Sequence, residues 1–252
     1  MILFFIFALG AIVGSFLNVC IVRLPKRESL IHPSSHCPYC NKPIRFYDNI
    51  PIISYIILRG KCRYCKHPIS PRYPVVEGLT GLTAVALFLR YGPTVEFVLF
   101  FFFSSALLVI TFIDLAHQII PDAISIPGIL AGFGASFLFS SVSWLESLLG
   151  ILAGGGILLL IAVGYKWITK RDGMGGGDIK LLAMMGAWLG WAAVPFIILA
   201  SSLIGIFVGG GSGLLLRKGL RTRIPFGPFL AVGSFLYLFF GPEIIRWYIG
   251  LQ

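Results

Sequence analysis

Apolar residues are gathered into long blocks that few charges interrupt. The blocks cover residues 1–22, 73–89, 94–113, 123–142, 146–165, 179–216 and 224–245. A helix needs roughly 20 such residues to cross a bilayer. The block at 179–216 has 38 residues, enough for two helices, and Pro195 near its middle favours a turn there. The pattern therefore predicts eight membrane-spanning helices.

The composition excludes an ordinary water-soluble domain. Hydrophobic residues make up 57% of the 252 positions and charged residues only 12%, too few to cover the surface of a soluble core. We therefore expect an all-α polytopic membrane protein with about eight transmembrane helices. Its expected parts are a first helix at 1–22, a polar loop at 23–72 and a helical membrane core at 73–252.

The basic residues predict the orientation of these helices. Eighteen of the twenty fall into three segments, at 23–72, 166–180 and 217–223. With eight spans and both termini outside, all three segments lie in the cytoplasm, where Lys and Arg collect. The net charge of +10 therefore indicates orientation and contact with anionic lipid rather than nucleic-acid binding. The first block lacks a basic segment before it, so we expect it to stay as an anchor rather than be cleaved as a signal peptide.

The polar loop holds four of the five cysteines in two C-x2-C pairs. The pairs, CPYC and CRYC, belong to a small repeat, C-x-Y-C-x-x-P-I, and 21 residues separate them. This spacing favours one tetrahedral Zn²⁺ in a closed structural site of the zinc-ribbon kind, bound by Cys37, Cys40, Cys62 and Cys65. Two disulfides, another metal or free thiols are the alternatives, and a cytoplasmic loop disfavours the disulfides. Because four cysteines complete such a site, we expect the neighbouring histidines at the surface: His32, His36 and His67.

Two aspartates stand at the ends of apolar blocks. Asp178 follows the glycines of GMGGGDIK, and Asp114 ends the third block. A carboxylate at a membrane is costly unless it is paired, solvated or needed, although Asp178 could also serve as a helix N-cap. The predicted topology brings both aspartates to one membrane face. Such a pair can share a proton, activate a water and protonate a leaving amide. The glycines 173, 175, 176 and 177 would let the extended backbone of a substrate approach.

Other polar residues near these sites have two interpretations each. Asp122 follows a proline and is expected to cap the fourth helix rather than act as a third acid. His117 and Lys180 can tune the aspartate pair or simply be solvated at the interface. Glu77 can serve a ligand, cap a helix or pair with Arg72.

Small and polar residues inside the apolar blocks predict contacts between helices. Ser15 and Asn18 share one helix face and are expected to bond to a neighbouring helix. Close helix packing is expected at glycines with four-residue spacing, namely Gly150 and Gly154, and Gly205, Gly209 and Gly213.

These stretches together resemble the type IV prepilin peptidases over nearly the whole chain. The matching motifs are GSFLNVCIVRLP, the paired CxxC with DNIPIISY between them, SPRYPVVEGLTG, FIDLAHQIIPD, GMGGGDIK and IPFGPFLAVG. The GxGD pattern alone is shared with presenilin-like and preflagellin peptidases, so the set as a whole carries the resemblance.

The resemblance implies a site and an activity. It assigns the catalytic pair to Asp114 and Asp178, and it implies cleavage after a glycine at the end of a short basic leader. The substrates would be prepilins or pseudopilins, cut at the cytoplasmic face of a bacterial inner membrane. Many such enzymes then methylate the new N-terminus with S-adenosylmethionine, and the zinc-bearing loop accompanies that bifunctional type. Glu77 would then hold the amine or the cofactor's sulfonium.

Three alternative functions also follow from the sequence. The first is a peptidase without methyltransferase activity. The second is an ion-coupled transporter, which would usually place paired acids near the membrane midplane in repeated halves. The third is a zinc-loop scaffold without catalysis, which would need no aspartates at two span ends.

Overall fold

The computed structural model of the chain describes residues 1–170, 175–216 and 225–250. These residues form helices and turns, with no strand in any of the three stretches. Contacts divide the chain into two compact units, Met1–Val109 and Ile110–Gln252, and each is described by itself.

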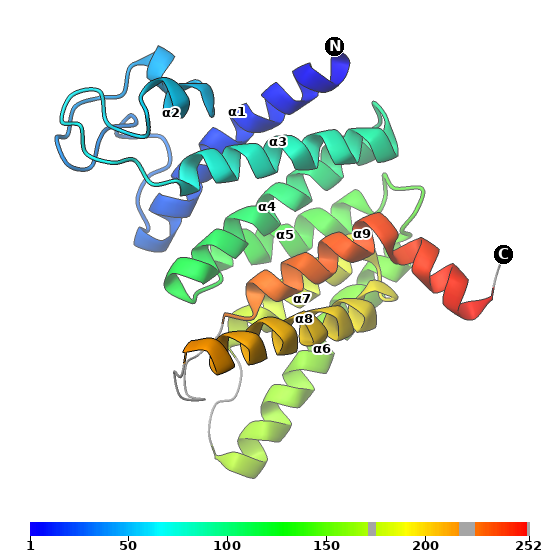
Figure 1. Cartoon of the computed structure of the whole chain (residues 1–252). Coiled ribbons are helices and arrows are strands. Elements are labelled where there is room, and N and C mark those ends of the chain that lie inside the picture. The colour runs from blue at the N-terminus through cyan, green and yellow to red at the C-terminus, as the bar shows by residue number, and fades with distance from the viewer. Residues whose placement is uncertain (171–174, 217–224, 251–252) are drawn as a thin grey trace. The chain divides into compact units, whose positions relative to one another are not determined.

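The first unit is built on two helices that lie side by side, α1 (Ile2–Arg23) and α3 (Arg72–Tyr91), as Figure 1 shows. Gly14 permits this close approach, because a Cβ there would come within 2.8 Å of the Cα of Glu77. The amide of Asn18 donates to the carbonyl oxygen of Tyr73 at 3.1 Å, and Ser15 bonds to the side chain of Glu77. The predicted helix-to-helix bonds of Ser15 and Asn18 are therefore confirmed.

The loop between α1 and α3 has little regular structure. It contains two short 3-10 turns, η1 (Leu24–Lys26) and η2 (Phe46–Asn49), and the short helix α2 (Ile53–Ile57). Its only bridges in the described chain are isolated pairs, one in each cysteine repeat, rather than the strands of a zinc ribbon. The unit continues into the first part of α4 (Val95–His117).

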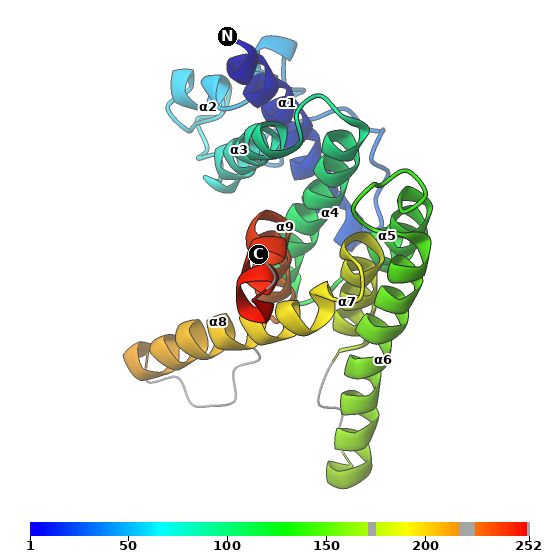
Figure 2. The same cartoon turned by 90° about the vertical axis from the view of Figure 1, so that its right-hand side faces the viewer.

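The second unit surrounds a buried helix. It holds the end of α4, then α5 (Asp122–Ala135), α6 (Trp144–Thr169), α7 (Gly176–Leu189), α8 (Ala193–Leu216) and α9 (Gly227–Ile249). Helix α7 packs against α5 and α6 (Figures 1 and 2), and it is buried from Leu181 to Leu189.

The glycines with four-residue spacing in this unit do not all lie at close contacts between helices. A Cβ at Gly150 would overlap the carbonyl oxygen of Gly186, and one at Gly154 that of Leu182, so the predicted close packing there is confirmed. At Gly205 a Cβ would make only ordinary contact with Phe229, at 3.7 Å. At Gly209 and Gly213 only the helical backbone is described, so the close packing predicted there stays a prediction.

Each predicted apolar block contains a helix, but some boundaries differ. The long block divides at residues 190–192, a few residues before Pro195, which lies in the first turn of α8. Helix α5 ends at Ala135 rather than at residue 142. Its 14 residues are about 21 Å long, shorter than the roughly 30 Å hydrocarbon core. The fourth predicted span is therefore wrong in its length.

Among the described residues, three helices are long and apolar enough to cross a membrane: α1, α4 and α6. Shorter apolar helices occur at Asp122–Ala135, Ala193–Val208 and Gly227–Gly241. The predicted total of eight spans thus stays a prediction, although the transmembrane character of the chain is clear.

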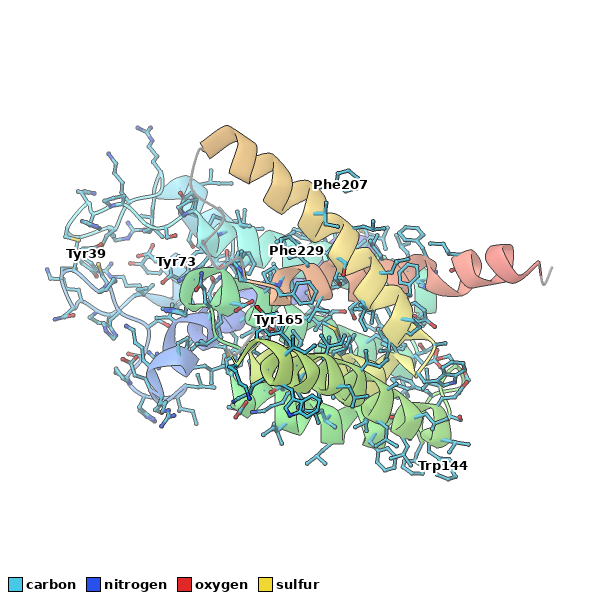
Figure 3. The ribbon with its side chains drawn as sticks, turned by 90° about the horizontal axis from the view of Figure 1, so that it is seen from below. Tyr39, Tyr73, Trp144, Tyr165, Phe207 and Phe229 are labelled. Atoms are coloured by element: carbon cyan, nitrogen blue, oxygen red, sulfur yellow. The ribbon has the colours of Figure 1, made fainter. Side chains whose placement is uncertain are left out.

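Large apolar side chains cover the outside of these helices. Trp144 and Tyr165, both exposed, lie near opposite ends of α6, and Phe207 projects outward from α8 (Figure 3). The two aromatic residues of α6 are 21 positions apart, or about 31 Å along the helix. This separation matches the distance between the two interfaces of a bilayer, where Trp and Tyr are enriched.

Candidate functional site

Asp114 lies in the last turn of α4 and is only 5% exposed. Its Oδ2 accepts a hydrogen bond from the backbone N–H of Gly227, the first residue of α9, at 3.0 Å. A Cβ at Gly227 would stand 2.7 Å from the same oxygen. Glycine is therefore the residue that lets α9 begin against the carboxylate. Gly227 is not among the site residues predicted from the sequence, although it lies in the matching IPFGPFLAVG stretch.

Asp178 is the third residue of α7 and is partly buried. The helix has Gly175 at its N-cap and no side-chain capping bond, so the N-cap alternative for Asp178 is not what the structure shows. Asp114 and Asp178 lie close enough for their charges to interact. The structure thus brings the end of α4 near the start of α7.

The glycines before Asp178 are not equivalent. No atom of the described residues lies within 4 Å of the place that a Cβ would take at Gly176, which is exposed. A Cβ at Gly175 would lie 3.7 Å from Asp178 Oδ2. At Gly177 it would lie 2.9 Å from the Cβ of Ile120, so packing alone explains that glycine. Gly173 lies outside the described residues. Among the described residues, the uncrowded positions before Asp178 are therefore Gly175 and Gly176.

An ion pair flanks the two aspartates. Lys180 Nζ lies 2.6 Å from Oδ1 of Asp122 and joins the first turns of α7 and α5. Asp122 begins α5 without a side-chain capping bond, so its predicted role as a cap is wrong. Lys180 therefore forms its ion pair with Asp122 rather than with Asp114 or Asp178. His117 is exposed at the end of α4, in agreement with a solvated position.

The four loop cysteines form a second candidate site. Their sulfur atoms all lie within 4.8 Å of one another, and the sulfurs of Cys37 and Cys65 are 3.8 Å apart. Zn–S bonds of about 2.3 Å in a tetrahedron place two sulfurs about 3.8 Å apart, so the donor set fits Zn²⁺. All four cysteines are free thiols, and no disulfide joins them.

The sequence repeat is also a structural repeat. In the first knuckle the N–H of Cys37 donates to Lys42 O, and in the second the N–H of Cys62 donates to His67 O. Backbone hydrogen bonds from Cys65 and Tyr64 lower the pKa of the Cys62 thiol to about 6. A backbone hydrogen bond from His67 lowers the pKa of the Cys65 thiol, but desolvation and hydrogen bonds to the other cysteine sulfurs outweigh it and raise that pKa to about 11. A thiol with a lowered pKa is readily deprotonated, as metal binding requires.

The side chains around the cysteines interact with other residues of the loop rather than with the cysteine sulfurs. The Arg63 guanidinium donates to both oxygens of Asp48, at 2.7 and 2.5 Å, and holds the pKa of that carboxyl below its usual range. His67 stacks on the ring of Tyr39, and His36 bonds to Ser34 O. None of the three nearby histidines belongs to the cysteine cluster, as expected.

Glu77 lies on α3 and is 7% exposed. Its Oε2 accepts a hydrogen bond from the N–H of Ile52 at 2.8 Å, and Ser15 of α1 supplies a second hydrogen bond. The alternative pairing with Arg72 is not found in the described part of the chain. Glu77 is therefore a buried acid whose hydrogen-bond partners are neutral groups.

Comparison with known proteins identifies the family of this chain. Residues 8–91 match the bacterial peptidase A24 N-terminal domain, and residues 101–210 match the type IV leader peptidase family. A prepilin leader peptidase/N-methyltransferase of Aeromonas hydrophila is 40% identical over an alignment of 268 positions, gaps included, which covers 97% of this chain and 92% of that protein. The chain belongs to the type IV leader peptidase family.

Two other members of the family match this chain over a similar length. Proteins with the same description from Pseudomonas aeruginosa and Pseudomonas putida are 38% and 36% identical. The matches cover 96% and 94% of this chain, and 91% and 90% of those proteins. No solved structure matches the chain. The resemblance drawn from the motifs is thus confirmed at the level of the family.

Proposed function

We propose that the chain is a membrane aspartic peptidase that removes the short leader of type IV pilin-like precursors, with Asp114 and Asp178 as its catalytic pair. The observation that carries the proposal is that the two carboxylates, one at the end of α4 and one at the start of α7, lie within reach of each other's charge. The names of the relatives, prepilin leader peptidase/N-methyltransferase, support the substrate class.

The proposed chemistry needs the two carboxylates to share one proton. Like charges in close contact cannot both ionise readily, so one group stays protonated. The ionised carboxylate takes a proton from a water molecule while the water oxygen attacks the scissile carbonyl carbon. The protonated carboxylate then gives its proton to the leaving nitrogen as the C–N bond breaks. The open space at Gly176 lets the substrate backbone approach beside Asp178.

We place this reaction at the cytoplasmic face of a bacterial inner membrane. The distribution of basic residues supports eight spans with both termini outside and with the loop at 23–72 in the cytoplasm. The proposed division is a first membrane helix at 1–22, the zinc loop at 23–72 and a membrane core with the peptidase site at 73–252.

We further propose that the enzyme methylates the new N-terminus, with S-adenosylmethionine as methyl donor. The name shared by the relatives supports this activity. Glu77 is the residue proposed to hold the donor's sulfonium or the amine. The negative charge of a buried carboxylate that is hydrogen-bonded only to neutral groups is complementary to a cationic ligand. The cofactor would supply the methyl group. The zinc would stabilise the loop, and we assign its four ligands to Cys37, Cys40, Cys62 and Cys65.

Substitution of each aspartate tests the peptidase. Asp114→Asn and Asp178→Asn should each lower the cleavage rate of a purified prepilin by at least about a thousandfold, and the double variant should be no worse, because the residues act as a unit. Asp122→Asn removes the same charge at the flanking ion pair and should cut within a few-fold of the wild type. Substantial cleavage by either single catalytic variant would contradict the assignment.

A further inference from the structure

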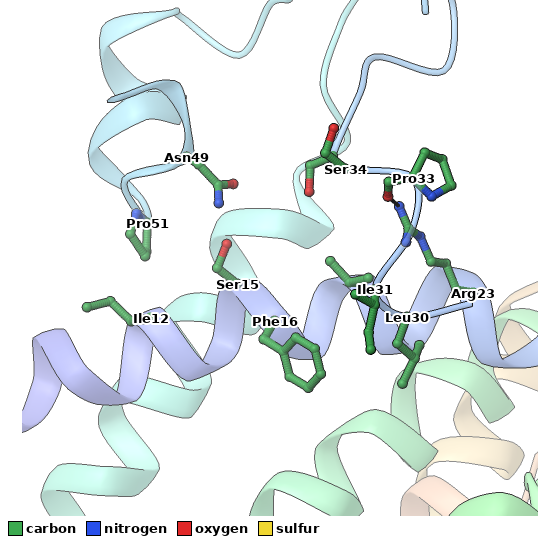
Figure 4. Close-up of a pocket in the computed structure, with 12 residues that line it drawn as sticks. Ile12, Ser15, Phe16, Arg23, Leu30, Ile31, Pro33, Ser34, Asn49 and Pro51 are labelled. Carbon is green, nitrogen blue, oxygen red and sulfur yellow. Dashed lines mark hydrogen bonds between the residues drawn. The ribbon is translucent and has the colours of Figure 1, made fainter. Parts of the chain in front are cut away.

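A pocket with a cavity volume of about 320 Å³ lies beside α1 in the first unit (Figure 4). At 100° per residue, Ile12, Phe16, Val19 and Arg23 lie on the side of α1 opposite Gly14, which packs on α3. Ser15 lies at the edge, where it also reaches Glu77 of α3, so most of the pocket is separate from the α1–α3 contact. The residues of α1 that line it are Ile12, Ser15, Phe16, Val19 and Arg23.

One end of the pocket carries a buried cation. Arg23 is 9% exposed, and its guanidinium donates to the carbonyl oxygens of Ser29 at 2.8 Å and Pro33 at 2.6 Å. Both acceptors are neutral. In the described stretches of the chain no carboxylate pairs with Arg23. Because a buried charge is normally compensated, the remaining N–H groups of this guanidinium suit an anionic group.

The rest of the pocket is an apolar stripe open to the surroundings. Ile12 and Phe16 are 57% and 52% exposed, and together with Val19 they line one side of α1 as far as Arg23. From Ile12 to Arg23 the stripe is about 16 Å long. It lies on a helix that is long and apolar enough to cross a membrane. Such a stripe suits an acyl chain parallel to the helix, with the polar side chain of Ser34 near the charged end and that of Asn49 near Ser15 and Pro51 (Figure 4).

We propose that this pocket binds one anionic glycerophospholipid, with its phosphate against Arg23 and one acyl chain along the stripe. The charge of the loop supports an anionic occupant, since residues 23–72 contain ten basic and two acidic residues. A small soluble anion would leave the stripe uncovered, and a zwitterionic lipid would gain less from the guanidinium. The proposal depends on α1 lying in the membrane and not on the peptidase chemistry.

The test measures lipid retained by the purified full chain in native mass spectrometry. Phosphatidylglycerol and phosphatidylcholine with the same acyl chains are titrated separately. The wild type should retain one phosphatidylglycerol at about tenfold lower concentration than phosphatidylcholine, and Arg23→Gln should remove this preference. Arg27→Gln, the same charge change at an exposed neighbour, should keep it.

A second variant covers the case in which Arg23→Gln loosens the loop. Val19→Trp fills the pocket from α1 and leaves both Arg23 hydrogen bonds in place, so it should lose the bound phosphatidylglycerol. Soluble glycerol phosphate and S-adenosylmethionine should fail to displace the lipid. Displacement by either would make the pocket a site for a small molecule and would overturn the proposal. So would equal losses in the Arg23 and Arg27 variants, or full retention in Val19→Trp.

Discussion

Among single residues, Gly227 contributes to the site through its backbone. Its N–H is the hydrogen-bond partner of Asp114, and its missing side chain leaves room for the carboxylate oxygen. A sequence motif can mark two aspartates as candidates because their side chains carry the chemistry. A backbone N–H has no such signature, so only the fold shows that the start of α9 reaches the end of α4.

Gly227→Ala should therefore reduce cleavage without unfolding the protein. The added methyl group would displace the Asp114 carboxylate by a fraction of an ångström or more, and misplacement on that scale can cost about a hundredfold in rate. The measurement is kcat/KM for leader release, together with its pH profile, which should change because a hydrogen bond to the pair has been altered.

The matched control for Gly227→Ala is Gly134→Ala in α5, where no atom of the described residues lies within 4 Å of the added Cβ. That variant should keep the wild-type rate and pH profile. A wild-type rate in Gly227→Ala would show that the hydrogen bond to Asp114 is not needed.

At the scale of elements, the cysteine loop was the most predictable part of the chain. Its repeat in sequence becomes two knuckles with the same backbone hydrogen bonds, and the four sulfurs meet as the spacing required. The strands of a ribbon did not follow, because spacing specifies the ligands and not the connection between them. Helix α5 was predicted too long because apolar composition alone does not show where a helix ends. In contrast, the start of the next helix, α6, is marked in the sequence by the capping box of Ser143 and Glu146.

The zinc assignment makes a prediction about this loop. Purified protein should contain about one zinc per chain, and Cys37→Ser or Cys62→Ser should lower that content and make the loop more sensitive to protease. The reason is that the binding energy of a structural metal site is also folding energy. The measurements are metal analysis and limited proteolysis of the intact chain.

Cys20→Ser provides the control for the loop variants, because Cys20 is a buried residue of α1 outside the cluster. It should leave zinc content unchanged. Zinc loss in Cys37→Ser with unchanged protease resistance of the loop would refute a structural role for the metal.

At the scale of the whole molecule, the chain's two groups of candidate functional residues fall in different units. The cysteines and Glu77 belong to Met1–Val109, whereas both aspartates belong to Ile110–Gln252. The two family matches, at 8–91 and 101–210, divide the chain in nearly the same way. The sequence predicted helices at the correct places, but it could not show that α1 belongs with α3. That grouping depends on close contacts at residues such as Gly14, and the hydrophobic pattern does not reveal the partner of a glycine.

This division predicts that the two proposed activities are separable. Cleavage needs two carboxylates that share a proton. Methyl transfer needs a neutral amine whose lone pair is aimed at the methyl carbon, and a group that accepts the amine's proton as the N–C bond forms. Glu77→Gln should therefore lower methyl incorporation at least about tenfold more than leader release, because the amide cannot accept that proton or balance a cationic ligand. Asp178→Asn should stop leader release and still methylate a synthetic peptide that begins at the mature pilin N-terminus.

Parallel assays of leader release and radiolabelled methyl incorporation on the same preparations decide between the outcomes. Asp122→Asn, which changes a carboxylate outside both sites, should retain both activities. Equal loss of both activities in Glu77→Gln would instead indicate that Glu77 acts by holding Ile52 and the loop in place, since it already accepts a hydrogen bond from that residue. If Asp178→Asn cannot methylate the pre-cut peptide, the two reactions must share one catalytic centre, because the peptide no longer needs to be cut.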